Sequence, residues 1–184
     1  MEISQKRFSN RTKFEFGEEE LKYTIRDKGS AADFKINYAE FPVSSNMREE
    51  RNEWLRNVGI IWILLGCFFL GTAILNDESI SGKGFWIMVG AVCLIFYKFS
   101  GTTYSVYPTE KGSLFIIRDK KYPEIINEIN SRKKNQLLEW HGEINRENDP
   151  QYEIDKFKWL NEQGVLTEEE TENKIEQIKW STKS

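Results

Sequence analysis

The sequence predicts an α+β membrane protein, in which antiparallel strands and a closing helix carry an inserted transmembrane helical hairpin and end in a two-helix tail. Three observations lead to this fold class. Two long uncharged apolar runs lie in a chain that is 30% charged overall. Apolar and polar residues alternate with period two on both sides of these runs, as in half-buried strands. Near the C-terminus, a glycine and a capping sequence separate two short helical patterns.

The N-terminal flank, residues 1–46, predicts three strands in a meander. Apolar and polar residues alternate at 13–16, 21–25 and 32–38, with turn-forming or acidic residues between these segments. The polar segment 44–57 that follows is rich in Arg and Glu. We expect it to be helical and continuous with the first apolar run, because both residue types favour helices.

The apolar middle predicts a transmembrane hairpin within residues 47–104. The first run holds eighteen residues without a charge and the second holds fourteen. About 20 apolar residues in a helix cross the ~30 Å hydrocarbon layer of a bilayer, so we expect spans at about 57–75 and 84–101. A buried hairpin in a soluble core is the alternative. It is disfavoured because such helices usually keep a polar face, which the first run lacks.

Small residues and basic residues add detail to this hairpin. Small residues that would let its two helices approach closely are Gly59, Gly66, Gly71, Gly90 and Ala91. Basic residues near the outer ends of the runs are Arg48, Arg51, Arg56, Lys98 and Lys111, whereas the loop between the runs has only Lys83. The positive-inside rule therefore predicts a multi-pass protein of the inner (cytoplasmic) membrane with both termini in the cytoplasm, and the lipid bilayer as a partner.

In the C-terminal flank, residues 105–142, the strand pattern of the N-terminal flank resumes. We expect strands at 102–107 and 113–118 and a helix at 122–141, with Pro123 in its first turn. Three strands alone leave an apolar face open and need a partner. The sequence therefore predicts that the two flanks close on each other as one cytoplasmic domain, with the hairpin inserted between its strands.

Two stretches carry a resemblance to a known family. They are LKYTIRDKGSAADFKINYAEF, where a turn joins two strands, and GSLFIIRDKKYPEIINEINSRKK, where the last strand leads into the helix. Together they resemble a bacterial pleckstrin-homology-like domain, here split by the hairpin. In bacteria, domains of this family often lie beside paired membrane helices, so the resemblance implies a cytoplasmic domain at a membrane.

The tail, residues 150–181, reads as two helices with a tight connection. Gly164 stands where a helix commonly ends in the left-handed conformation, and Thr167 with Glu170 forms a T-x-x-E capping box for the next helix. The stretch WLNEQGVLTEEETENKIEQI resembles the short C-terminal domain called SHOCT. That resemblance implies oligomerisation or contact with another protein. We expect the contact to involve Phe157, Leu160, Gly164, Val165, Leu166, Thr167, Ile175 and Ile178; the alternative is a solvated helical hairpin without a partner.

The sequence offers no recognisable catalytic or cofactor chemistry. His141 is the single histidine, and the two cysteines lie in the apolar runs, so no ordinary zinc site can be assembled. The cluster Arg132, Lys133 and Lys134 predicts either a solvated helix face or contact with phosphate headgroups at the membrane surface. The net charge of −3 includes no strongly basic region, which argues against nucleic acid as a partner.

Together these patterns predict a membrane-anchored, non-enzymatic scaffold or adaptor. It would self-assemble as a homo-oligomer or recruit a cytosolic protein through its cytoplasmic domain and its tail. The alternative is a membrane component of a bacterial defence or toxin-immunity system, which the small size, the hairpin anchor and the lack of catalytic motifs would also fit.

Overall fold

A computed structural model describes residues 1–7, 10–26 and 31–181 of the chain. It divides into two compact units. The first unit holds Met1–Asn46 and the chain from Ser105 onwards, and the second holds Met47–Tyr104. Both antiparallel sheets and the helices agree with the predicted α+β class.

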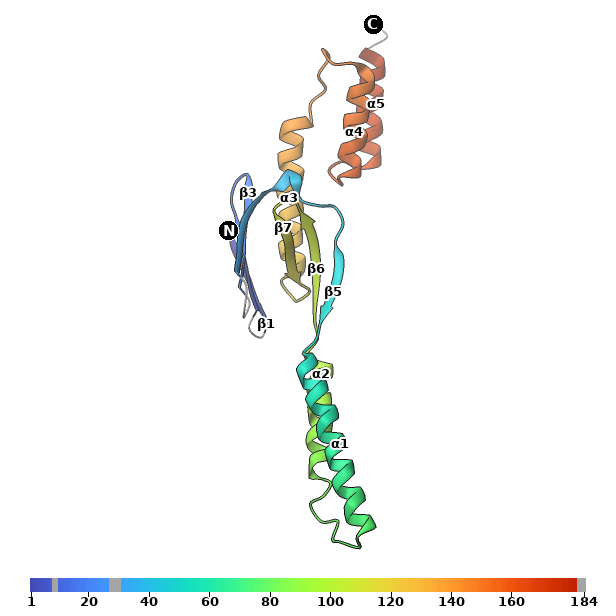
Figure 1. The fold of residues 1–184 in the computed structure, drawn as a ribbon. Helices are drawn as coiled ribbons and strands as arrows, with labels where there is room; N and C mark the ends of the chain where they lie inside the picture. The colour runs from blue at the N-terminus through green and yellow to red at the C-terminus, as the bar shows by residue number, and fades with distance from the viewer. Residues whose placement is uncertain (8–9, 27–30, 182–184) are drawn as a thin grey trace. The chain divides into compact units, whose positions relative to one another are not determined.

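Four strands form the first sheet, and three form the second (Figure 1). The first has the order β1 (Glu2–Arg7), β2 (Asn10–Phe16), β3 (Glu20–Arg26) and β4 (Ala31–Asn37), each strand antiparallel to the next, and a 3-10 turn (Tyr38–Glu40) follows. The second has the order β5 (Asn46–Glu50), β6 (Thr102–Thr109) and β7 (Gly112–Ile117). The helices are α1 (Glu53–Leu75), α2 (Phe85–Phe99), α3 (Tyr122–His141), α4 (Pro150–Glu162) and α5 (Glu168–Ser181).

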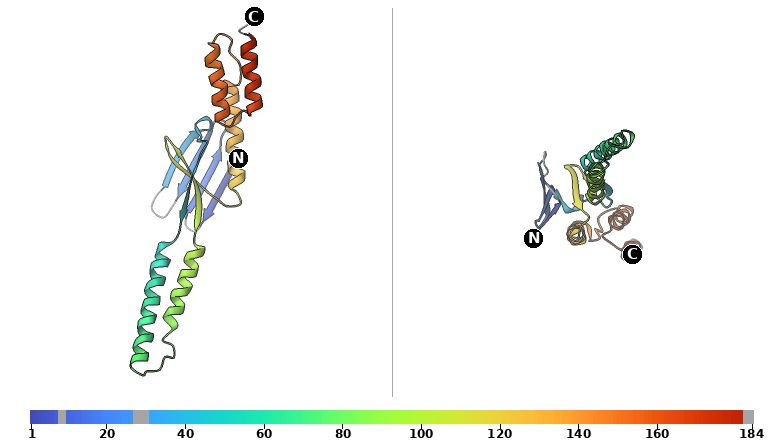
Figure 2. Two further views of the ribbon diagram at one scale, coloured as in Figure 1. Left: turned by 90° about the vertical axis from the view of Figure 1, so that its right-hand side faces the viewer. Right: turned by 90° about the horizontal axis from the view of Figure 1, so that it is seen from below.

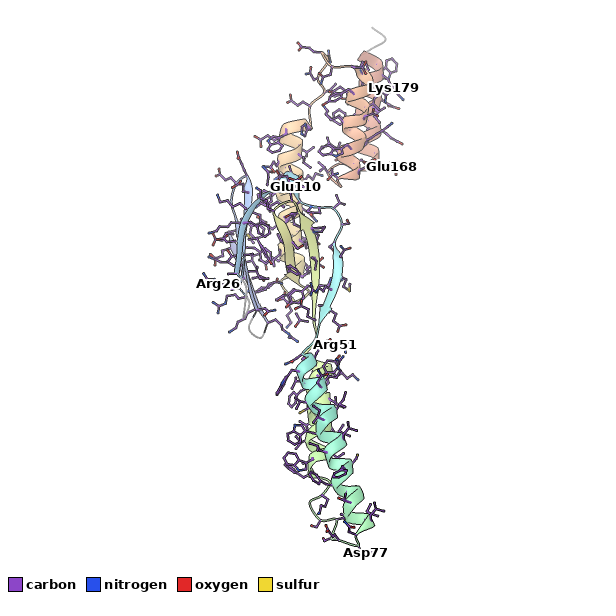
Figure 3. The ribbon with its side chains drawn as sticks, in the orientation of Figure 1. Arg26, Arg51, Asp77, Glu110, Glu168 and Lys179 are labelled. Carbon is purple, nitrogen blue, oxygen red and sulfur yellow. The ribbon has the colours of Figure 1, made fainter. Side chains whose placement is uncertain are left out.

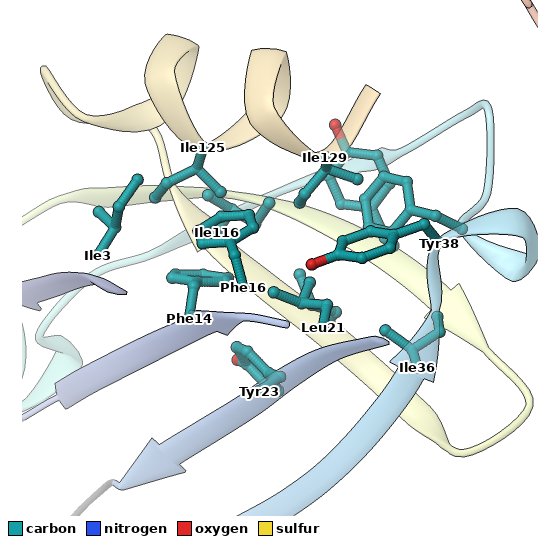
Figure 4. Packing of buried hydrophobic residues seen from close by; sticks show 13 residues of the cluster. Ile3, Phe14, Phe16, Leu21, Tyr23, Ile36, Tyr38, Ile116, Ile125 and Ile129 are labelled. Carbon is teal, nitrogen blue, oxygen red and sulfur yellow. The ribbon is translucent and has the colours of Figure 1, made fainter. Parts of the chain in front are cut away.

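The core of the first unit combines side chains from both flanks of the hairpin. Figure 4 shows Ile125 and Ile129 of α3 reaching toward Phe16 and Leu21 of the first sheet. Full burial of side chains of this kind contributes about 1.5–3 kcal/mol each. The buried members of the cluster are Ile3, Phe14, Phe16, Leu21, Tyr23, Ile36, Tyr38, Phe41, Tyr107, Leu114, Ile116, Ile125 and Ile129.

Strand β1 was not among the predicted strands because its buried face is only partly apolar. Ile3 and Gln5 are its two buried residues, and the glutamine is 1% exposed. Its amide nitrogen donates to the carbonyl of Ile117 and to a carboxylate oxygen of Asp119, both at 2.7 Å, and its amide oxygen accepts from the Ile117 N–H at 3.0 Å. These hydrogen bonds to a distant segment satisfy the buried amide. The local sequence pattern does not predict them.

Strand β5 corrects a second expectation. Residues 46–50 were predicted to be helical and continuous with the first span, but they form a strand, and α1 begins at Glu53. All five side chains of the strand are exposed or partly exposed, so no alternation marks it. Pairing with β6 determines its conformation, and tertiary context commonly overrides propensity in this way.

The second unit contains the apolar hairpin, in which α1 and α2 lie side by side (Figure 2). Gly59, Gly66 and Gly90 lie at the contact: a Cβ atom on any of them would come within 3.0 Å of an atom of the other helix. Beside them, the indole rings of Trp62 and Trp86 stack with their centroids 4.2 Å apart. The predicted close approach is confirmed for these glycines.

Two of the small residues expected at the hairpin contact lie outside it. A Cβ on Gly71 would meet nothing within 4 Å, and Ala91 is exposed. Both expectations were wrong, because α2 starts too late in the chain to reach Gly71, and Ala91 points away from α1.

Candidate interaction site

The ends of the tail helices are built as the sequence indicates. The carboxylate of Asp149 accepts hydrogen bonds from the N–H groups of Gln151 and Tyr152 at 2.8 and 3.3 Å and so caps α4. Gly164, with φ of +72°, lies just beyond the end of this helix. The N–H of Thr167 donates to Glu170 at 2.8 Å, and the N–H of Glu170 donates back to the threonine hydroxyl at 3.2 Å. Both hydrogen bonds of the capping box are therefore made.

The apolar stripe of the tail is covered by the same chain. Phe157 and Leu160 of α4 are fully buried, and Val165 and Ile178 are nearly so, in a cluster with Leu137 of α3. Partly buried neighbours of this cluster are Ala39, Leu138, Ile144, Ile154 and Leu166. These side chains were expected to contact a partner. In this structure they hold the tail against α3 and present little surface to another molecule.

The other predicted contact residues of the tail have mixed positions. Ile175 is half-buried, and Gly164 and Thr167 are exposed in the turn between α4 and α5. Their backbone and hydroxyl groups serve the helix ends described above. Their part in the structure is thus to fix the angle between the two helices.

A buried lysine ties the tail to the rest of the first unit. Lys133 is only 4% exposed, and its ammonium group donates to the carbonyl of Phe41 at 2.8 Å and to the side-chain oxygen of Gln163 at 2.9 Å. Burial lowers the pKa of this lysine, because the charged form loses its hydration. The two acceptors come from the loop after the 3-10 turn and from the end of α4, so one side chain of α3 joins both.

The predicted headgroup cluster is consequently not a single exposed surface. Lys133 is buried, and Arg132 is held by Glu128 at 2.7 Å with its guanidinium over the rings of Phe16 and Tyr38. Only Lys134 is exposed. Residues 132–134 therefore do not form one exposed cationic surface in this structure, and a side chain with satisfied internal partners gains little from leaving them.

Glu153 fixes the connection between α3 and α4. This carboxylate is 1% exposed and accepts hydrogen bonds from the N–H of Asn145 at 3.1 Å, the side chain of Asn148 at 2.8 Å and the ammonium of Lys156 at 2.6 Å. Burial by itself opposes ionisation, but these three donors outweigh it and hold the pKa of Glu153 below its usual value. The charge is thus compensated inside the fold.

The outer side of the tail presents aromatic rings that the sequence reasoning missed. Tyr152 and Trp159 lie seven residues apart on the same side of α4, beside the buried stripe, and the tyrosine is 62% exposed. Trp140 at the end of α3 is also exposed. The ring of His141 lies edge-on to both tryptophans, with centroids 6.4 Å from Trp140 and 5.8 Å from Trp159. These four residues are called the aromatic face below. The seven-residue spacing of Tyr152 and Trp159 was the signal available in the sequence.

A second missed feature is a row of basic residues at one end of the first sheet. The strand register places Lys6 directly opposite Arg11, and Arg11 directly opposite Arg26; Figure 3 labels the last of these. All three are exposed, and none forms an ion pair with a described residue. Like charges directly opposite each other destabilise a sheet. This basic row is therefore a place where an anion would relieve repulsion.

The remaining outer face of that sheet is internally neutralised. Lys13 pairs with Glu2 at 3.0 Å and with Glu15 at 2.6 Å, and Lys35 pairs with Glu20 at 3.2 Å. Within the described residues, no group of three or more His, Cys, Asp or Glu side chains is arranged to hold a metal ion. The basic row is distinguished by its lack of such neutralising partners.

The hairpin of the second unit presents an extensive apolar surface. Among the described helices, α1 is the one that is long and apolar enough to cross a membrane, judged by length and composition, and only 17% of its most apolar stretch is buried. Helix α2 is apolar but has 15 residues. Large exposed apolar side chains of the two helices are Ile60, Ile61, Leu64, Leu65, Phe68, Phe69, Ile74, Leu75, Phe85, Met88, Val92, Ile95, Phe96 and Phe99.

Comparison with known proteins adds no relative. No protein-family model matches the chain, and no curated protein or solved structure matches it significantly.

Proposed function

We propose that this chain is a membrane-anchored, non-enzymatic scaffold or adaptor. The observation that carries the proposal is the exposed apolar surface of the α1–α2 hairpin. Soluble monomers rarely expose contiguous apolar patches larger than a few hundred Å². Lipid acyl chains would cover such a surface, while the backbone hydrogen bonds of both helices remain satisfied internally, as a bilayer requires.

The charges at the ends of the hairpin favour one orientation. Figure 3 shows Arg51 and Asp77 at opposite ends of this unit. The guanidinium groups of Arg51 and Arg56 lie 5.9 and 6.0 Å from the ring of Tyr97, at the end where Lys98 also lies. Aromatic and basic residues together are typical of a cytoplasmic interface. We therefore place both termini in the cytoplasm and the protein in the inner membrane as a multi-pass protein.

The first unit would be the cytoplasmic domain. Its proposed assignment as a split pleckstrin-homology-like domain is supported by the order of the elements. The described residues form seven strands in two antiparallel sheets, of which β5 lies almost wholly in the second unit, and α3 follows the last strand. The family fold has seven strands, and β1 and β5 complete that number. The helix ends around Gly164 and Thr167 in the same way support the SHOCT-like assignment of the tail.

The contact with a partner is assigned to the aromatic face, since the apolar stripe of the tail is covered. Tyr and Trp are the residues most often found to dominate binding energy at interfaces, and Tyr152, Trp159 and Trp140 are exposed. Anchoring to a membrane raises the effective concentration of such a surface, so that weak contacts become productive. The partner is a second copy of the chain or a cytosolic protein.

The basic row would provide a contact with the membrane surface, since residues 132–134 do not present one exposed cationic surface. Lys6, Arg11 and Arg26 are exposed and unpaired among the described residues. Each basic residue near an anionic leaflet contributes about 1 kcal/mol. This contact supplements the hairpin and does not replace it.

Insertion tests the anchor directly. Purified protein is mixed with phosphatidylcholine vesicles, floated through a density gradient and extracted with alkaline carbonate. An inserted hairpin keeps the protein with the lipid after extraction. Recovery of all protein in the extract would show that the hairpin does not span the bilayer, and would remove the observation on which the proposal rests.

Mass measurement tests the aromatic face. Light scattering of the detergent-solubilised protein is compared with that of a Tyr152→Ser, Trp159→Ser variant and of a Lys158→Ser control on the same helix. We expect the original protein and the Lys158→Ser control to have the mass of an oligomer, and the aromatic variant to have the mass of a monomer. If all three have the mass of a monomer, self-assembly is wrong, and a pull-down from a cytosolic extract with the same variants would test recruitment.

A further inference from the structure

The two sides of the hairpin differ in apolar length. In the packed pair, Gly59 faces Gly90 and Leu94, and Gly66 faces Ile87. Helix α2 begins at Phe85, and this pairing places its first turn beside Gly66. The rest of α1, residues 67–75, continues past the start of α2, a distance of about 13 Å at 1.5 Å per residue.

This projecting end of α1 has no helix beside it. Phe68, Ile74 and Leu75 are exposed along it, and a Cβ on Gly71 would meet nothing within 4 Å. The chain that returns to α2 is the polar segment 76–84. Within that segment Lys83 and Glu78 form an ion pair at 3.1 Å.

The charged residues at the ends of each helix set the apolar length on its side. Arg56, in the first turn of α1, and Asp77, just past its end, bound its uncharged stretch; at the helical rise their separation of 21 residues corresponds to about 31 Å, close to the ~30 Å hydrocarbon layer. Lys83, just before α2, and Lys98, in its last turn, bound the uncharged stretch of this helix; at the helical rise their separation of 15 residues corresponds to about 22 Å. In a bilayer of ordinary thickness, one side of the hairpin fits and the other is short by about 8 Å.

The two kinds of mismatch are not equivalent. A helix that is too long for a bilayer tilts, kinks or thickens it, whereas a helix that is too short thins it, extends its flanking side chains to the surfaces or pulls its polar ends inward. Pulling residues 76–84 inward would place the Lys83–Glu78 pair and irregular backbone in hydrocarbon, at a cost of several kcal/mol for each unsatisfied group. The short helix therefore determines which bilayer fits.

We propose that the lipid partner of the hairpin is a thin bilayer, with a hydrocarbon layer matched to the ~22 Å apolar length of α2 and with the excess length of α1 taken up by its projecting end, residues 67–75. This inference rests on the proposed membrane insertion. It specifies the chemistry of the partner as short-chain lipid and excludes a hairpin that is indifferent to thickness.

The test is insertion into vesicles that differ only in acyl-chain length: dimyristoleoyl, dipalmitoleoyl, dioleoyl and dierucoyl phosphatidylcholine. The carbonate-resistant fraction of full-length protein is measured in each. We expect this fraction to be about threefold or more larger in the two short-chain lipids than in dierucoyl vesicles, since mismatch costs fractions of a kcal/mol per Å. An optimum in dioleoyl or dierucoyl vesicles, or equal insertion in all four, would overturn the inference and leave the anchor intact. Insertion in none of them would instead refute the proposed function.

A pair of loop variants isolates the short side. The first triple variant extends the apolar surface next to α2; it is Glu78→Gln, Ser81→Leu, Lys83→Leu. The second triple variant removes the same charges without adding apolar length; it is Glu78→Gln, Ser81→Asn, Lys83→Gln. The optimum of the first variant is expected to move to longer chains, and that of the second to stay with the original protein. An unchanged optimum in the extended variant would show that α2 does not set the preferred thickness.

Discussion

Gly90 shows how a single missing methyl group determines the hairpin. A Cβ there would come within 2.6 Å of the carbonyl oxygen of Gly59 and of a side-chain carbon of Ile63, and within 2.9 Å of the Ile63 nitrogen. Two of these three atoms belong to backbone, which cannot move aside as the end of a flexible side chain can. The helix axes would have to separate, and the stacked indoles of Trp62 and Trp86 would separate with them.

Gly90→Ala is therefore expected to disrupt the hairpin contact, and Gly71→Ala to leave it unchanged. Both changes raise helix propensity by about 1 kcal/mol, so propensity does not distinguish them. The clash does, because Gly71 has open space around it. The circular-dichroism exciton signal of the two stacked indoles should weaken in Gly90→Ala alone. Equal signals in both variants would contradict the packing described for this glycine.

Glu153 makes the stability of the tail depend on pH. Its pKa is lower in the folded chain than the value of 4.5 for a free side chain, so the unfolded chain binds the proton more tightly. Its contribution is fully present above pH 4.5 and is lost as the pH falls through the folded pKa. Burial of Glu153 opposes this contribution, but the donors from Lys156, Asn148 and Asn145 outweigh it.

We expect Glu153→Gln to destabilise the tail at neutral pH by about 1–3 kcal/mol, the usual cost of leaving buried partners of a charged group unsatisfied. Tryptophan fluorescence during urea unfolding measures this. The difference from the original protein should shrink below pH 4.5, where the original carboxylate is itself protonated. Glu162→Gln, at an exposed position on the same helix, is the control and should cost little at any pH. A difference that is independent of pH would contradict an ionised Glu153.

At the level of elements, the sequence predicted those with a complete local pattern and missed those defined by a partner. Helix α3 runs from Tyr122 to His141, as expected, and β2, β3, β4, β6 and β7 lie where alternation placed them. Strand β1 depends on the hydrogen bonds of Gln5 with Ile117, and β5 on pairing with β6. Neither dependence produces an alternation of apolar and polar residues in the sequence of the strand itself.

The basic row leads to a prediction about the stability of the first sheet, because repulsion between its like charges destabilises that sheet. Arg11 lies between Lys6 and Arg26 in the register of β1, β2 and β3, and like charges in such positions cost about 0.2–1 kcal/mol per pair. Arg11→Thr should therefore raise the melting temperature of the first unit and weaken binding of the protein to anionic vesicles relative to neutral ones. Differential scanning calorimetry and flotation measure the two effects.

The matched control for this change is Lys22→Thr, on the neighbouring strand of the same sheet. Lys22 lies within 3.8 Å of Glu15 and 3.9 Å of Asp33, so its loss removes attraction and not repulsion. We expect no gain in stability from it. If both substitutions raise the melting temperature equally, β propensity explains the effect, and the repulsion attributed to the basic row is wrong.

At the scale of the whole molecule, the candidate site could be predicted only in part. The apolar stripe of Phe157 and Leu160 was visible in the sequence, but its occupant was not: α3 of the same chain covers it through Leu137. Lys133 interrupts the apolar stripe of α3, and the structure explains this by its two acceptors, the carbonyl of Phe41 and the side chain of Gln163. Which side of an amphipathic helix faces a partner depends on docking between distant segments, and that information is not local.

The shared core of the two flanks leads to a prediction about the whole chain. One buried cluster contains residues from both flanks of the hairpin: members between Ile3 and Phe41 precede it in the sequence, and members between Tyr107 and Ile129 follow it. Strands β5 and β6 are neighbours in their sheet, although the hairpin separates them in sequence. Adjacent antiparallel strands can be joined by a two-residue turn. The hairpin should therefore be dispensable for the fold of the first unit, because it occupies the place of a turn.

Replacing residues 51–101 with Asn-Gly is thus expected to give a soluble protein that unfolds in a single cooperative transition and no longer floats with neutral vesicles. Residues 1–50 and 102–184 produced separately should each be unfolded, since each would expose its own part of the shared cluster, and mixing them should restore structure. Circular dichroism and calorimetry report all three states. Independent folding of either fragment would mean that the flanks are separate domains. Loss of structure in the joined variant would mean that the hairpin contributes to the fold as well as to the proposed anchor.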